Sequence, residues 1–76
     1  MENEMPGTTT TTYTVTWADG TTNVYVSKGT CVETSDSGGT VQWVFMPNAT
    51  KDGEDPKNRN IHLGIAREWS KTVVTT

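Results

Sequence analysis

The sequence has very little of what builds a catalytic or metal site. It contains one cysteine, Cys31, and one histidine, His62, among 76 residues. A single cysteine excludes an intramolecular disulfide, and a single histidine excludes a multi-histidine metal site. The position of His62 on the strand face opposite the apolar residues argues against a catalytic triad. A Cys31–His62 pair could activate a thiolate only if their strands were neighbours, and nothing in the sequence brings them together. We therefore expect no enzymatic activity, no cofactor and no metal.

Long apolar segments are lacking as well. Hydrophobic residues make up 32% of the chain, and no run approaches the length of a membrane-spanning helix. The segment 1–7 carries Glu2 and Glu4 without an apolar stretch, so it resembles neither a signal nor a transit peptide. Together with the lone cysteine, these features predict a cytoplasmic protein with no membrane partner.

Positive charge is sparse. Six Lys and Arg residues are scattered along the chain against nine Asp and Glu, for a net charge of −3. Without a dense basic stripe to neutralise phosphates, nucleic acid is a disfavoured partner. Asp52, Glu54 and Asp55 crowd one segment, but their spacing does not match an EF-hand loop, so a solvated acidic loop is the preferred interpretation.

The sequence is rich in threonine, and in several segments apolar residues recur at every second position. β-branched residues favour strands over helices, and in the segment from Thr10 to Trp17 the apolar residues Tyr13, Val15 and Trp17 alternate with threonines. Further strands are predicted at 22–27, 30–34, 40–46, 61–65 and 72–75. Turn signals at Asp19-Gly20, Lys28-Gly29 and Gly38-Gly39 predict that the first four strands pair sequentially as a meander.

These patterns predict a single all-β domain over residues 8–76, preceded by a flexible lead at 1–7. Five to six strands would form a small antiparallel meander that curls into an SH3-like barrel or a two-layer roll. The polar segment 47–60 is predicted to be a long loop, either functional or mobile. The expected core consists of Tyr13, Val15, Trp17, Val24, Val26, Val32, Trp43, Phe45, Ile61, Leu63, Ile65 and Trp69.

Candidate partner-binding residues are predicted from surface aromatic side chains, from basic side chains and from an exposed strand edge. Tyr25 and Trp69 are predicted surface aromatics, a residue class that is enriched in binding hot spots. The first strand would expose backbone groups on its polar side if it lay at a sheet edge. The full candidate set is Tyr25, Trp69, Lys57, Arg59, Thr12 and Thr14.

The hypothesis that best fits these features is a non-enzymatic protein-interaction module that acts through a strand edge or an aromatic patch. The thin apolar content favours a homo-oligomer, or a subunit or inhibitor of a larger partner. The alternative is a small β-barrel that binds a nucleotide or single-stranded nucleic acid by stacking, with Trp69, Tyr25, Lys57 and Arg59 at its mouth. The small size suggests, by analogy alone, a viral or mobile-element protein.

Overall fold

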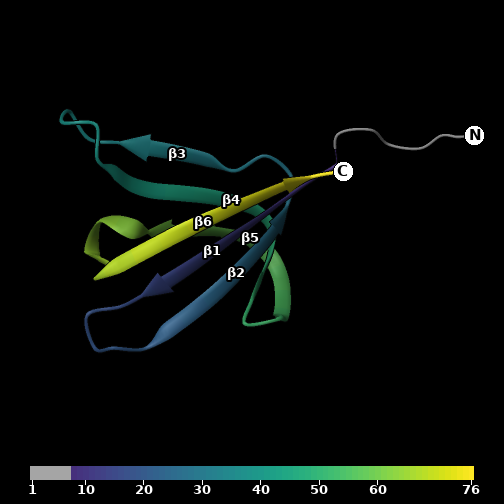
Figure 1. The fold of residues 1–76 in the computed structure, drawn as a ribbon, viewed down its shortest axis with the longest axis horizontal. Coiled ribbons are helices and arrows are strands. Elements are labelled where there is room, and N and C mark those ends of the chain that lie inside the picture. The colour runs from purple at the N-terminus through teal and green to yellow at the C-terminus, as the bar shows by residue number, and fades with distance from the viewer. Residues whose placement is uncertain (1–7) are drawn as a thin grey trace, which may run out of the picture.

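The computed structural model describes residues 8–76, and the predicted flexible lead at 1–7 lies outside the described residues. The described chain forms one antiparallel sheet that curls into a half-barrel (Figure 1). Its elements are β1 (Thr9–Thr16), β2 (Thr22–Lys28), β3 (Val32–Ser35), β4 (Val41–Lys51), β5 (Glu54–His62), the 3-10 turn η1 (Leu63–Ile65) and β6 (Glu68–Thr75). The predicted all-β class is confirmed.

β4 is the strand that joins the two parts of the sheet. The strand order is β3-β4-β2-β1-β6, and β5 pairs with β4. The β1–β2 and β3–β4 hairpins form as predicted, but β2 does not pair with β3. Instead β3 pairs with β4 residues 41–45 and β2 pairs with residues 49–51. The prediction of strictly sequential pairing is therefore wrong at Lys28-Gly29, where the chain passes from one half of β4 to the other.

The predicted loop 47–60 is a hairpin of two strands. β4 continues to Lys51, and β5 begins at Glu54 (Figure 1). The ladder register shifts once between Met46 and Ala49 and again between Ala49 and Lys51. Each shift accommodates a proline, Pro47 in β4 and Pro56 in β5, because a bulged position does not need a ladder amide. The prolines bend these strands and do not end them.

The core lies on the concave side of the sheet. Its buried hydrophobic residues are Tyr13, Val15, Tyr25, Val44, Met46, Ala49 and Leu63. Tyr13, Val15 and Leu63 confirm the prediction, and Trp17, Ile61 and Trp69 pack against this core while remaining partly exposed. Val26 is half-buried.

Five predicted core residues are exposed instead, namely Val24, Val32, Trp43, Phe45 and Ile65. β2 and β4 present the opposite faces to the core from those predicted, because Tyr25 on β2 and Val44 and Met46 on β4 point inward. A one-residue change of register is enough to exchange the faces of a strand. The predicted strand 61–65 ends at His62, and the chain turns through η1. The last strand therefore begins earlier than predicted and contains Trp69.

Adjacent residues on β4 test which face is the core. Met46 is fully buried whereas Phe45 is 38% exposed. We expect Met46→Ala to lower the free energy of unfolding by about 2–5 kcal/mol and Phe45→Ala by about 1 kcal/mol or less. Urea denaturation followed by tryptophan fluorescence measures both. Equal losses would contradict the assignment of the two faces.

Candidate functional site

The convex side of the sheet carries a cluster of apolar and aromatic side chains on three adjacent strands. Val32 on β3 lies opposite Phe45 on β4, and Trp43 on β4 lies opposite His62 on β5. Directly opposed residues share a face, and residues two apart on one strand do so too. We call these four residues, Val32, Trp43, Phe45 and His62, the outer aromatic patch.

The outer aromatic patch is open to solvent. Val32 is 56% exposed, Trp43 43% and Phe45 38%. The His62 imidazole stacks on the Trp43 indole, with ring centroids 4.2 Å apart and planes 4° from parallel. Stacking against His62 orients the indole, so that a large apolar surface is presented with little conformational freedom left to lose on binding.

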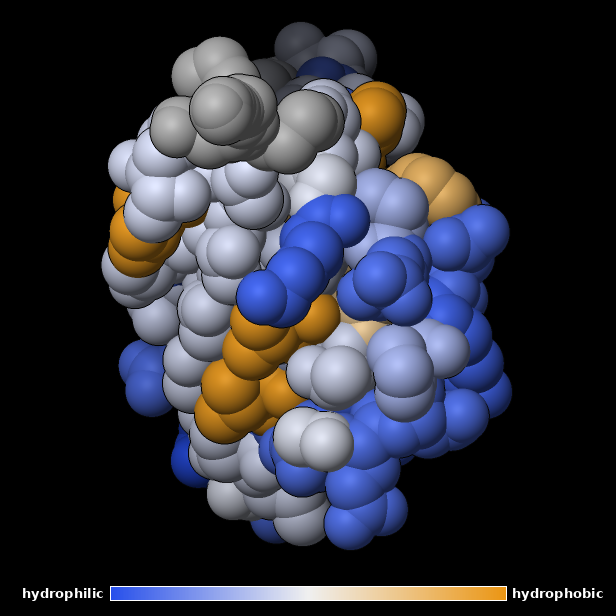
Figure 2. Space-filling model, turned by 90° about the vertical axis from the view of Figure 1, so that its right-hand side faces the viewer, coloured by the Kyte–Doolittle hydropathy of each residue, from blue (hydrophilic) through white to orange (hydrophobic). Residues whose placement is uncertain are grey.

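Large exposed hydrophobic residues also lie outside this patch in the described chain. On the side drawn in Figure 2, hydrophobic residues form separate patches divided by paler and charged side chains. The remaining large exposed hydrophobics are Val24, Ile65, Val73 and Val74. Aromatic residues in this exposed set occur only in the outer aromatic patch, among the residues that the structure describes.

On the concave side, a polar network joins β3 to β1 and β6, two strands with which β3 does not pair. Glu33 on β3 accepts hydrogen bonds from the Tyr13 hydroxyl at 2.6 Å and from the Lys71 ammonium at 2.8 Å. The Lys71 bond, followed by the Tyr13 bond, lowers the pKa of the Glu33 carboxyl. Burial, followed by the hydrogen bond to Glu33, raises the pKa of the Tyr13 phenol. The network therefore links β3, β1 and β6 by side chains.

This network predicts a specific acid sensitivity. Because the pKa of Glu33 is lowered in the folded state, its contribution is present above its ordinary pKa of 4.5 and is lost as the pH falls through the folded value. We expect Glu33→Gln to lower the free energy of unfolding at neutral pH by about 1 kcal/mol and to flatten the acid limb of the stability curve. Exposed Asp19, Asp36 and Asp52 also have lowered pKa values, so the variant should still lose some stability in acid.

Urea unfolding of the wild type and Glu33→Gln at a series of acidic pH values measures the difference. The raised pKa of the Tyr13 phenol affects stability at alkaline pH, because its contribution to the free energy of unfolding is lost as the pH rises through the folded value. The variant should therefore change the acid side of the curve. A variant that loses stability in acid as steeply as the wild type would contradict a coupled Glu33.

An open pocket of about 350 Å³ lies beside the same network, lined by Tyr13, Cys31, Glu33, Lys71 and Val73 among others. Cys31 is a half-buried free cysteine packed against the core, whereas His62 stacks on the exposed Trp43. The structure therefore does not bring Cys31 and His62 together as a thiolate-imidazole pair. The pocket lies between β3 and β6, which are bridged by the ion pair of Glu33 and Lys71.

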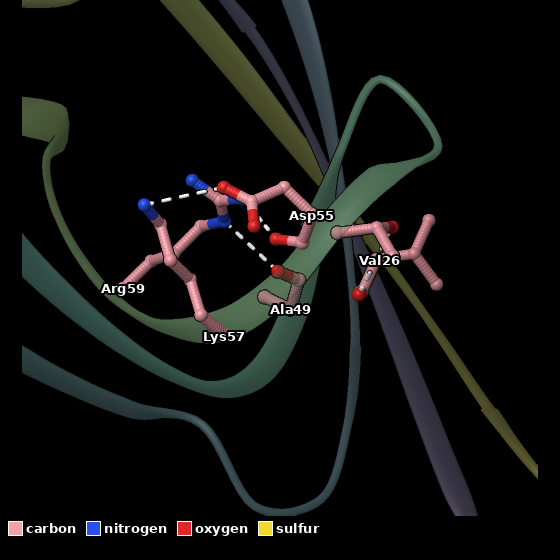
Figure 3. Close-up of polar contacts among 6 residues, drawn as sticks. Val26, Ala49, Asp55, Lys57 and Arg59 are labelled. Carbon is pink, nitrogen blue, oxygen red and sulfur yellow. Dashed lines mark hydrogen bonds and ion pairs between the residues drawn. The ribbon is translucent and has the colours of Figure 1, made fainter.

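The predicted basic residues Lys57 and Arg59 are already engaged with the chain itself (Figure 3). Arg59 donates from Nε to the Ala49 carbonyl at 2.8 Å and from Nη2 to the Asp55 carbonyl. Its side chain is only 10% exposed. Lys57 is exposed and pairs with the Asp55 carboxylate at 3.2 Å. Arg59 thus braces the bulged hairpin, and neither residue is a free cation at a binding mouth.

The two predicted surface aromatics lie on the concave side. Tyr25 is 3% exposed and belongs to the core, so its prediction as a surface residue is wrong. The cause is the register of the first hairpin, which sets Tyr25 opposite the buried Tyr13. Trp69 is partly exposed and packs on the Tyr13 ring, with centroids 5.8 Å apart. The structure does not gather the predicted candidates at one site.

Thr12 and Thr14 lie on the convex face of β1, but β1 is not an edge strand. It pairs with β2 on one side and with β6 on the other along most of its length. The premise that β1 exposes its backbone at an edge is therefore wrong. The strands that do lie at edges of the described sheet are β3, β5 and β6.

Sequence reasoning missed the outer aromatic patch because it assigned Val32, Trp43 and Phe45 to the core. Both faces of β4 are apolar, since Val44 and Met46 alternate with Trp43 and Phe45. Alternation alone therefore does not identify the exposed face. The useful signal is the pairing of β4 with β5, which places the polar His62 and Asn60 opposite Trp43 and Phe45.

Comparison with protein-family models, curated proteins and solved structures finds no match to this chain. Within residues 8–76, no group of three or more His, Cys, Asp or Glu side chains is arranged to hold a metal ion. The described part of the chain also has no helix long and apolar enough to cross a membrane.

Proposed function

We propose that this chain is a non-enzymatic protein-interaction module that binds a larger partner through the outer aromatic patch. The observation that carries the proposal is the exposure of Trp43 and Phe45 on one face of β4, beside the exposed Val32 on the adjacent strand β3. Tryptophan and other aromatics at the centre of interfaces account for much of the binding energy, because they bury large area with few rotatable bonds. A role as a subunit or an inhibitor of that partner follows from the same surface.

The chemistry of the patch indicates an apolar partner surface. None of its four residues is Lys, Arg, Asp or Glu, and the facing residues on the same strands, Thr34 and Asn60, are also uncharged. Depletion of charge around an aromatic centre is typical of protein interfaces. The partner we propose is therefore a folded protein with an apolar pocket or face that receives Trp43.

The alternative of single-stranded nucleic acid has less support. Stacking sites for bases combine aromatics with a basic groove, and the two basic residues expected there, Lys57 and Arg59, are engaged by Asp55. Tyr25, the other expected stacking residue, is buried. One face of the exposed Trp43 ring is already covered by His62. A viral or mobile-element origin and a cytoplasmic location stay predictions.

Substitutions on the patch should remove partner binding without unfolding the chain. We expect Trp43→Ser and Phe45→Ser to reduce capture of a partner by the tagged full chain at least tenfold, since hot-spot side chains contribute about 2 kcal/mol or more. The matched control is Val24→Ser, an equally exposed valine on β2 outside the patch. Quantitative mass spectrometry of proteins captured from the cells in which the chain occurs provides the measurement.

The decisive outcome is a protein retained by the wild type and Val24→Ser but lost with both patch variants. If the patch variants capture the same proteins as the wild type, the proposal is overturned. Single-stranded oligonucleotides at low salt, where electrostatic binding is strongest, should leave tryptophan emission unchanged. A saturable change that Trp43→Ser abolishes would favour the nucleic-acid alternative.

A further inference from the structure

The three edge strands of the sheet differ in how well they are protected. β3 is only four residues long and has a register shift before Ser35. β5 contains Pro56, two register shifts in its ladder and a run of charged residues. Short strands, prolines, bulges and charges are the devices by which proteins prevent an edge from pairing with another chain. β3 and β5 are therefore both poor templates for a further strand.

β6 has almost none of these devices. It pairs with β1 in unbroken register over eight residues, from Glu68 to Thr75, and contains neither proline nor glycine. Its exposed Val73 and Val74 are each 52% accessible. The charged residue in its middle, Lys71, is paired with Glu33 at 2.8 Å and so is held over the concave face. β6 is therefore a long and regular edge, with two adjacent exposed valines near its C-terminal end.

The backbone of β6 presents a defined set of hydrogen-bonding groups outward. Thr76 donates its amide to the Thr8 carbonyl, so this opposed pair is a hydrogen-bonded one. In an antiparallel ladder the direction of the backbone groups alternates, so the even-numbered residues of β6 face β1. The amides and carbonyls of Trp69, Lys71, Val73 and Thr75 consequently point away from β1, and no described strand pairs with them.

We propose that β6 pairs antiparallel with β6 of a second copy of this chain, centred on Thr72, to form a two-fold symmetric dimer. In this register Lys71 faces Val73 of the second copy, and Glu68 faces Thr76. Every outward amide from Trp69 to Thr75 then meets a carbonyl, and no like charges are directly opposed. A register centred on Lys71 would oppose two ammonium groups, which destabilises a cross-strand pair.

Self-pairing of β6 is favoured over pairing of β6 with another edge of the same protein. The alternative edge of comparable length, β5, carries Pro56 and shifts register twice against β4, so it lacks a regular ladder to continue. A symmetric contact also closes on itself, whereas a contact between two different edges can propagate into open assemblies. The 76-residue chain gains buried surface in this way that its thin core does not supply.

Proline at an outward position tests the pairing selectively. Val73→Pro removes an amide that points away from β1, so it should abolish the dimer and leave the β1–β6 ladder in place. Val73→Thr is the matched control, because it keeps the amide and the branched shape of the side chain. We expect sedimentation velocity at micromolar concentration to give twice the 8.3 kDa chain mass for the wild type and Val73→Thr, and one chain mass for Val73→Pro.

A wild type that stays monomeric, or a folded Val73→Pro variant that stays dimeric, overturns the proposal. If circular dichroism shows that Val73→Pro is unfolded, disulfide trapping in a Cys31→Ser background decides the matter. Thr72→Cys should cross-link to a dimer on mild oxidation, because the two substituted residues are opposed on the axis. Ser70→Cys should not, since it faces Val74 of the second copy. Equal cross-linking of the two variants would overturn the register.

The dimer is independent of the proposed partner site. Trp43→Ser lies on β4 and should leave the sedimentation of the chain unchanged. Loss of partner capture by Trp43→Ser with an intact dimer supports both proposals. A monomeric wild type that still captures a partner through Trp43 overturns self-pairing alone.

Discussion

The fold depends on the bend of β4 at Pro47 and Asn48. Asn48 has a φ of +47° and sits in the bulge that shifts the β4–β5 register. The hydroxyl of the fully buried Ser27 donates to the Pro47 carbonyl at 2.6 Å, which ties β2 to this bend. Gly29 passes so close to the Pro47 ring that a Cβ there would lie 3.1 Å from it, at a φ of +143° that favours glycine. Because β4 bends here, one half of it pairs with β3 and the other with β2.

The class of fold could be predicted from the sequence because alternation and turn chemistry are local properties. Which side chains of β2 point to the core could not be predicted, because this depends on the length of one turn. A two-residue turn at Asp19-Gly20 would have set Tyr13 opposite Val26. In the observed hairpin the Trp17 amide donates to the Thr21 carbonyl at 2.8 Å, which leaves three residues in the loop and sets Tyr13 opposite Tyr25. This one-residue difference sends Tyr25 to the core and Val24 and Val26 to the convex face.

The candidate site was less predictable than the fold for a related reason. Exposure of Trp43 depends on which of the two apolar faces of β4 meets the concave side, and this is decided by the pairing of Ala49 with Ser27, far along the strand. Prolines in 47–60 also suggested a loop, because sequence alone does not distinguish a proline that ends a strand from one that occupies a bulge. The acidic and basic residues of that segment, such as Asp55 and Arg59, serve to hold the bulged hairpin together.

The way in which the half-barrel is closed explains why an edge remains available. Between β3 and β6 the contact is made by side chains, with Glu33 held between Tyr13 and Lys71. A barrel closed by backbone pairing would have used the outward amides of β6, whereas closure by side chains leaves them to another strand. The same bridge neutralises Lys71, the residue that would otherwise protect this edge by its charge. The network that stabilises the monomer thus also leaves β6 suited to pair with a second chain, on a different strand from the aromatic surface of β4.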